Sequence, residues 1–232
     1  MNKVLALLTM ILSLSANAQG GIFGKDPIIN LENIDKKPIS WGYYLGVNFY
    51  DFKMDYKRDA KDVTVNSTTG FNVGMIGNVR ISNHFDVRLE PGVSFTTRNL
   101  TFHQVPDVYD QLREVKSTYI NIPIIVHYSA KRTGNIKPYL LGGYMHSINL
   151  AANEDAKDDN SAQKFRMKSA TGSMVAGVGI DLYFEYFKFS PSIRGVFGID
   201  DELVRDNDPN SPWTGNIHKM NTRGVFLNFA FH

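Results

Sequence analysis

From residue 41 to residue 231 the chain alternates apolar and polar residues in eight stretches, joined in turn by long and short connections. Successive side chains of a strand point to opposite sides, so each stretch predicts a strand with one apolar face. An up-and-down membrane barrel combines tight turns on one side with longer loops on the other. The pattern therefore predicts an all-β fold: an eight-stranded antiparallel up-and-down transmembrane β-barrel.

The boundaries of these stretches and connections follow from the alternation. The predicted strands cover residues 41–52, 69–81, 86–97, 116–128, 136–150, 170–182, 187–199 and 225–231. The predicted long loops cover residues 55–68, 103–115, 151–169 and 200–222, and the short turns cover residues 82–85, 129–135 and 183–186. Tyr and Trp near the strand ends beside the short turns predict an aromatic girdle of Trp41, Tyr43, Tyr44, Tyr128, Tyr183 and Tyr186.

The N-terminus has the features of a secretory signal. Lys3 precedes an apolar run from Val4 to Leu14, and a small-residue site at Ala16 and Ala18 follows it. Residues 1–18 are therefore expected to be a cleaved signal peptide, residues 19–40 a periplasmic lead-in, and residues 41–232 the outer-membrane β-barrel domain. No later segment has the roughly 18 to 20 apolar residues that a membrane-spanning helix needs.

Composition narrows the function classes. The 25 basic and 23 acidic residues are interspersed and leave a formal charge of +2, so no basic patch for nucleic acid is expected. The chain has no cysteine, which excludes disulfide frameworks and thiolate metal sites. We expect neither cofactor nor metal.

Charged residues recur on the face of the strands that is predicted to point inward. An eight-stranded barrel is only wide enough for side chains to fill its interior, so an open pore is not expected. Buried charges persist when they are paired. We expect Glu90 and Asp181 to partner inward arginines in a structural lumenal network rather than a binding site, with these members: Arg80, Arg88, Glu90, Asp181 and Arg194.

Catalytic motifs are sparse. The six histidines form no HExxH motif and no i, i+4 pair, so zinc chemistry lacks a scaffold. His146 beside Ser147 is the nearest candidate for a lipid-modifying nucleophile and base, but adjacent strand residues point to opposite faces. No catalytic residue is therefore predicted.

Two predicted loops are acidic, and a divalent cation bridging lipopolysaccharide phosphates is one interpretation of them. Their spacing matches no calcium loop, so solvated charge is the favoured one. The residues are Glu154, Asp155, Asp158 and Asp159 in one loop and Asp200, Asp201, Glu202, Asp206 and Asp208 in the other.

Several stretches resemble the outer-membrane β-barrel proteins of the PorT family from Bacteroidetes. They are residues 41–48 (WGYYLGVN), 88–95 (RLEPGVSF), 119–128 (YINIPIIVHY), 138–143 (PYLLGG) and 186–194 (YFKFSPSIR), in the same order. The closing segment, residues 197–225, resembles more narrowly the PorT/SprT branch, which belongs to type IX secretion and gliding motility. One departure is His232, which follows Phe231 where such chains end on an aromatic residue.

The resemblance implies a non-enzymatic accessory component of type IX protein secretion, located in the outer membrane. Its expected contacts are membrane lipid, lipopolysaccharide and protein partners of the secretion machinery, and the family supplies no catalytic residue to carry over. The alternatives are a generic small barrel for adhesion or surface stability and, third, a lipid A-modifying enzyme. A soluble lipocalin-like barrel is the rival at the level of fold.

Overall fold

The computed structural model describes residues 28–58, 63–156 and 165–232, and this part of the chain is almost entirely β-structure. The predicted signal peptide lies outside the described residues. The elements are η1 (Ile34–Lys36), β1 (Ile39–Tyr56), β2 (Val63–Ser67), β3 (Thr69–Arg80), β4 (Phe85–Leu89), β5 (Gly92–Phe102), α2 (Val108–Gln111), β6 (Leu112–Ser129), β7 (Ile136–Asn149), β8 (Ala170–Tyr183), β9 (Lys188–Gly198) and β10 (Ile217–Phe231).

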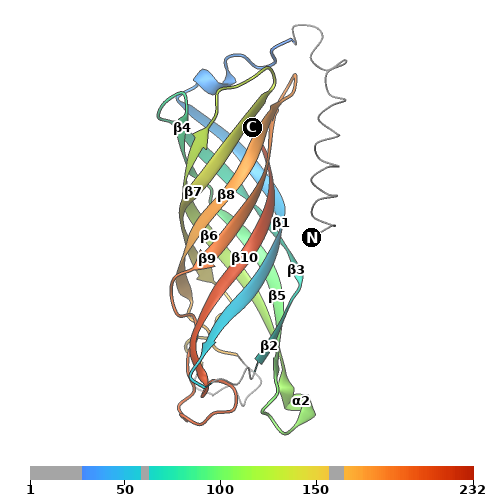
Figure 1. Ribbon diagram of the computed structural model, residues 1–232, viewed down its shortest axis with the longest axis vertical. Coiled ribbons are helices and arrows are strands. Elements are labelled where there is room, and N and C mark those ends of the chain that lie inside the picture. Colours follow the sequence, from blue (N-terminus) through green and yellow to red (C-terminus); the bar gives the residue numbers. More distant parts are fainter. Residues whose placement is uncertain (1–27, 59–62, 157–164) are drawn as a thin grey trace, which may run out of the picture.

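The strands form one closed antiparallel barrel (Figure 1). Two wall strands are interrupted: β2 and β3 are separated at Thr68, and β4 and β5 at Glu90 and Pro91. Each remaining strand pairs with its neighbours in sequence, and β1 closes the ring by pairing with both β10 and β3. The barrel thus has eight wall strands, and the predicted eight-stranded up-and-down fold is confirmed.

The two ends of the barrel differ. One end carries the short turns after β3, β6 and β8, which lie at the top of Figure 1, and we call it the turn end. The other end carries α2 and the longer connections, and we call it the loop end. The strands reach farther toward the loop end than predicted: β1 continues to Tyr56, β6 begins at Leu112 and β10 begins at Ile217.

A hydrophobic cluster explains the longer strands. Inward-facing side chains at the loop end bury one another in what we call the loop-end core, made of Phe52, Val63, Leu100, Phe102, Val105, Val115, Phe165, Met167, Leu203, Ile217 and Met220. The predicted loops at residues 55–68, 103–115 and 200–222 were therefore too long. Removing this apolar surface from water stabilises the ends of the strands. The alternation in these strand ends covers too few residues to be distinguished from a loop by sequence pattern alone.

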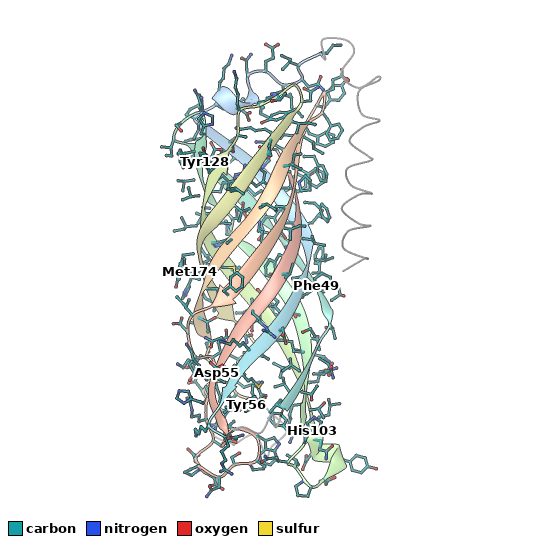
Figure 2. The ribbon with its side chains drawn as sticks, viewed as in Figure 1. Phe49, Asp55, Tyr56, His103, Tyr128 and Met174 are labelled. Atoms are coloured by element: carbon teal, nitrogen blue, oxygen red, sulfur yellow. The ribbon has the colours of Figure 1, made fainter. Side chains whose placement is uncertain are left out.

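The outer face of the barrel carries a broad band of exposed apolar side chains. Trp41 is 76% exposed and Met75 is 67% exposed. Figure 2 places Tyr128 near the turn end, Phe49 and Met174 at mid-height, and Asp55 toward the loop end. The predicted aromatic girdle was wrong at Tyr44 and Tyr183, which point inward and are 5% and 2% exposed.

The described part of the lead-in, residues 28–38, lies across the turn end (Figure 1). It contains the short η1 turn and leads directly into β1. In the described ranges the structure contains no helix of the length and apolarity that a membrane crossing requires.

Candidate functional site

A buried ion pair crosses the lumen. Glu90, at the break between β4 and β5, accepts hydrogen bonds from both terminal nitrogens of Arg194 on β9, and the Nη2–Oε1 distance is 3.3 Å. Both side chains are nearly inaccessible to solvent, at 1% and 4% exposure. The bidentate geometry is the strong form of an arginine–carboxylate contact.

Tyr44 covers this pair from β1. Its hydroxyl donates to the backbone oxygen of Glu90 at 3.4 Å, and its ring lies over Gly74 and Gly92. A Cβ atom built on Gly92 would lie 2.2 Å from the Tyr44 oxygen. Glycine is therefore required where this ring crosses the neighbouring strands β3 and β5, in which Gly74 pairs with Tyr44 and Gly92 pairs with Gly74.

The other members of the predicted charge network are distributed differently. Asp181 accepts a hydrogen bond from Ser190 at 2.6 Å and lies 3.8 Å from the ammonium of Lys188, rather than beside an arginine. Arg88 is buried and donates from Nε to Asn78 at 3.0 Å. The structure therefore brings only Glu90 and Arg194 of the predicted set into direct contact.

Arg80 lies apart from the lumenal pair, at the turn end. Its guanidinium donates to the backbone oxygens of Lys36 and Ser82, each at 3.3 Å, and to Asn83. Arg80 occupies an inward-facing position in the alternation of β3. Because it is the final residue of that strand, its long side chain reaches the rim.

The middle of the lumen is filled by large side chains. This cluster consists of Tyr50, Tyr119, Ile125, Tyr139, Leu141, Met145, Val175, Val196 and Phe226. Together with the ion pair on one side and the loop-end core on the other, it occupies the barrel interior along its length. A small cavity beside Glu90 and Arg194 has a volume of about 20 Å³, which is about the space of one water molecule.

Arg98 is a buried lumenal charge that the sequence reasoning missed. Its guanidinium carbon lies 3.7 Å from the centre of the Phe52 ring, and it donates to the Tyr119 hydroxyl at 2.6 Å and to Thr222 at 3.1 Å. Thr222 in turn donates from both its N–H and its hydroxyl to buried Glu202. The sequence does contain a signal for this position, because Arg98 continues the alternation of inward-facing residues beyond the predicted end of its strand.

His146 and Ser147 do not meet. Ser147 is buried on the inward face of β7 and donates to Asn121 at 2.8 Å. His146, one residue earlier on the same strand, has the opposite phase and is half-buried on the outer face. The described residues therefore bring no nucleophile and base together at this position.

The acidic residues of the loops serve mainly as local acceptors. Asp200 accepts from the N–H of Gly172 at 2.7 Å, and Asp201 accepts from Arg205 at 2.8 Å and from the N–H of Met220 at 3.1 Å. Asp158 and Asp159 lie outside the described residues. In the ranges that the structure covers, no group of three or more His, Asp or Glu side chains has an arrangement that would hold a metal ion.

The lead-in inserts a carboxylate into the turn end of the barrel. Asp35 of η1 accepts from the Tyr183 hydroxyl at 2.5 Å and lies 3.6 Å from Lys137 and 3.7 Å from Lys188. Although burial raises the pKa of this carboxyl, the charge of Lys188, the hydrogen bond from Tyr183 and the charge of Lys137 together hold it below its usual value of 3.8.

Backbone contacts hold the same segment in place. Arg132, in the turn after β6, donates to the backbone oxygens of Asn30 and Leu31, and its guanidinium stacks on the Tyr183 ring at 3.6 Å. The Asn135 side chain bonds the main chain at Ile28 and Asn30, each at 2.9 Å. The described lead-in is thus an ordered cap over the barrel mouth.

A basic cavity of about 380 Å³ lies between this cap and the barrel rim, and we call it the mouth pocket. Seven basic side chains line it against three acidic ones, Glu32, Asp35 and Asp86. The basic residues are Lys36, Lys37, Arg80, Lys131, Arg132, Lys137 and Lys188. Opposite charge attracts, so the pocket favours an anionic group.

Residues 17–204 match the model of a family described as the outer membrane protein beta-barrel domain. The chain belongs to this family. Its membership places the protein in the bacterial outer membrane, where the exposed apolar band of the barrel contacts lipid. In outer-membrane barrels of this kind the short turns face the periplasm and the long loops face outward.

Solved outer-membrane barrels are similar in architecture to this family member. OprG from Pseudomonas aeruginosa gives a TM-score of 0.44 at 13% identity over 83% of this chain and 93% of that chain. Neisserial surface protein A gives 0.45 at 10% identity over 84% and 97%, and AlkL gives 0.46 at 13% identity over 82% and 89%. No curated protein matches the chain significantly.

Proposed function

We propose that this small outer-membrane barrel is a non-enzymatic accessory component of type IX protein secretion that acts by binding other proteins. The sequence resemblance to the PorT family supports the secretion role. The observation that carries the binding role is the occupied lumen: an ion pair, an aromatic cluster and the loop-end core fill it in succession. A barrel filled in this way supports function at its two ends rather than transport through its interior.

The periplasmic end supplies the better-defined contact surface. The mouth pocket has an excess of four basic side chains over acidic ones, and Arg80 and Arg132 there bind backbone or amide oxygens rather than carboxylates. An acidic segment of a periplasmic partner would complement this charge. Recognition residues often lie on irregular segments held by a rigid scaffold, as the capped rim is here.

Deleting the gene and measuring secretion tests the assignment. Loss of secretion across many cargo proteins, restored by the parent gene, is the expected result. Normal secretion with altered adhesion would instead support a general role in adhesion or surface stability. Outer-membrane levels of the barrel, measured by heat-modifiable migration on gels, must be equal in the parent strain and in the deletion strain that carries the restored gene.

Matched variants separate binding from catalysis. Lys131→Glu combined with Arg80→Glu reverses charge at the mouth pocket, and we expect it to impair secretion. His146→Ala and Ser147→Ala remove the nearest candidate for a catalytic base and nucleophile. We expect normal secretion in these variants, because neither side chain acts as a base or a nucleophile in this protein. The reverse outcome, with His146→Ala abolishing secretion and the charge reversal harmless, would return the lipid-modifying enzyme to first place.

A further inference from the structure

The barrel wall is interrupted on one side of its extracellular end, between β1 and β2. The ladder between β1 and β3 runs from Ile39, opposite Val79, to Phe49, opposite Thr69, and ends there. Beyond Phe49, β1 pairs with β10 alone, and β2 has β5 as its one ladder partner in the described part of the chain. Figure 1 shows β1 and β2 diverging toward the loop end. We call this break, between residues 50–56 and residues 63–67, the seam.

A β-bulge at Thr68 accounts for the seam. Phe71 faces Phe95 in the ladder, but Ser67 faces Arg98, so the β2–β3 strand accommodates one extra residue between these pairs. The N–H and the hydroxyl of Thr68 both donate to the backbone oxygen of Thr97, at 3.2 Å and 2.7 Å. A bulge bends its strand and re-aims the side chains that follow.

The bulge reverses which residues of β2 face inward. Val63 is buried in the loop-end core, and Val65 packs against it from a partly buried position. Without the extra residue, the alternation of β3 would direct both valines outward. The strand is therefore anchored to the interior by two apolar side chains while its edge toward β1 is left without a ladder.

Side chains take the place of a neighbouring strand along the seam. Alternate residues of a strand direct their main-chain groups to the same side. Because Thr68 faces β5, Val63, Val65 and Ser67 face the seam. The oxygen of Val63 accepts from the Tyr56 hydroxyl at 3.2 Å, and the N–H of Phe52 donates to the carboxylate of Asp51 at 2.8 Å.

The seam lies outside the lipid-facing band. On β1 the outward positions change from apolar Leu45 and Phe49 to Asp51, Lys53 and Asp55. Lys53 and Asp55 form an exposed pair at 3.7 Å, and Figure 2 places Asp55 well beyond Phe49 toward the loop end. The seam therefore lies on the aqueous side of the lipid-facing band, where Thr64, Asn66 and Ser67 of β2 are exposed.

We propose that the seam is a docking site for an extended segment of a second protein, which adds to the edge of β2 as a strand. Only another backbone presents donors and acceptors at the spacing of a strand edge, which is the basis of strand addition. One face of the added strand would contact the loop-end core and the other would contact water. The segment should therefore alternate apolar and polar residues. Its length would match the five residues of β2. This site does not depend on the type IX assignment.

The test uses the barrel refolded in detergent micelles and a labelled peptide of alternating valine and threonine. A second peptide with the same side chains carries N-methyl groups on alternate residues, so it cannot form one edge of a ladder. We expect the plain peptide to bind at least about tenfold more tightly, a difference of about 1.4 kcal/mol. Hydrogen exchange at Val63, Val65 and Ser67 should slow when it binds.

A proline variant addresses the same edge from the side of the barrel. Ser67→Pro removes an N–H that faces the seam, whereas Ser67→Ala removes only an exposed hydroxyl and is the matched control. Binding should fall about tenfold in the first and stay unchanged in the second. If Ser67→Pro fails to refold, the exchange measurement on the parent protein still decides.

Three results would overturn the proposal. They are equal binding of the two peptides, no binding of the plain peptide, and a peptide-free dimer in which the same amides are protected. The third would assign the seam to a second copy of this chain.

Discussion

The carboxylate of Glu90 and the guanidinium of Arg194 form a bidentate ion pair across the lumen, although 104 residues separate them in the sequence. Alternation of the strands directs both residues inward, and the closed barrel brings their strands to face each other. A pair buried in this way stabilises the protein mainly because neither charge is tolerable alone.

Removing one partner should therefore be costly. We expect Glu90→Ala to lower the free energy of unfolding by roughly 3 to 5 kcal/mol, because Arg194 would remain charged and unpaired in the lumen. Denaturant titration of the refolded barrel measures the change. Asp51→Asn is the control, since it weakens an exposed contact with Arg223 that is 2.6 Å long, and its effect should be about 1 kcal/mol or less. Equal effects of the two variants would contradict this account.

Arg98 should tolerate lysine poorly. Its guanidinium stacks on Phe52 and reaches three hydroxyls, those of Ser117, Tyr119 and Thr222. A lysine ammonium keeps the charge but lacks the planar fork that makes these contacts together. We expect Arg98→Lys to lower the free energy of unfolding by about 1 to 3 kcal/mol, while Arg223→Lys on the exposed surface changes it little. An unchanged denaturation midpoint for Arg98→Lys would show that charge alone is sufficient there.

The filled lumen predicts the absence of a steady pore. Barrels reconstituted into planar bilayers should give no stable single-channel conductance at neutral pH, because side chains occupy the interior along its described length. Eight-stranded barrels have room for side chains but not for an aqueous channel as well. A reproducible unitary conductance would contradict the packing.

The sequence predicted the architecture because one physical rule, alternation between a lipid face and an inner face, acts on every wall strand. Strand β3 illustrates this: Phe71, Val73 and Met75 face outward, while Asn72 and Ile76 are buried inside, as the alternation requires. The same rule placed Glu90 and Arg194 in the lumen. The alternation predicts which face of the strand a residue lies on, but not which side chain it contacts. It therefore could not predict that Asp181 lies beside Lys188 rather than beside an arginine.

The features that the sequence did not predict depend on three-dimensional packing. The bulge at Thr68 leaves no mark in the pattern beyond a single shift of phase, which resembles the end of a strand. Asp35 lies in a segment without periodicity, and its role emerges only where Lys137 and Lys188 meet it at the rim. The strand extensions beyond the membrane depend on the loop-end core, whose members come from distant parts of the chain.

The attachment of the lead-in should depend on pH through Asp35. The pKa of this carboxyl is lowered in the folded state, so its ionised form contributes stability at pH values above its usual pKa of 3.8. That contribution is lost as the pH falls through the lowered folded-state value. The cap should therefore stay in place from neutral pH to about pH 4 and loosen in stronger acid.

A fluorophore on a single introduced cysteine can follow this transition, because the chain itself contains no cysteine. In Glu32→Cys, a fluorophore on the exposed lead-in should show high anisotropy from pH 7 to about pH 4 and a decrease below that. Adding Asp35→Asn should lower the anisotropy at neutral pH, since the neutral amide cannot hold two ammonium groups. Adding Asp86→Asn is the matched control, because Asp86 lines the same pocket without a charge contact to the cap in the described structure. If Asp35→Asn and Asp86→Asn gave the same anisotropy as the parent at every pH, the lead-in would be held by its backbone contacts with Arg132 and Asn135 alone.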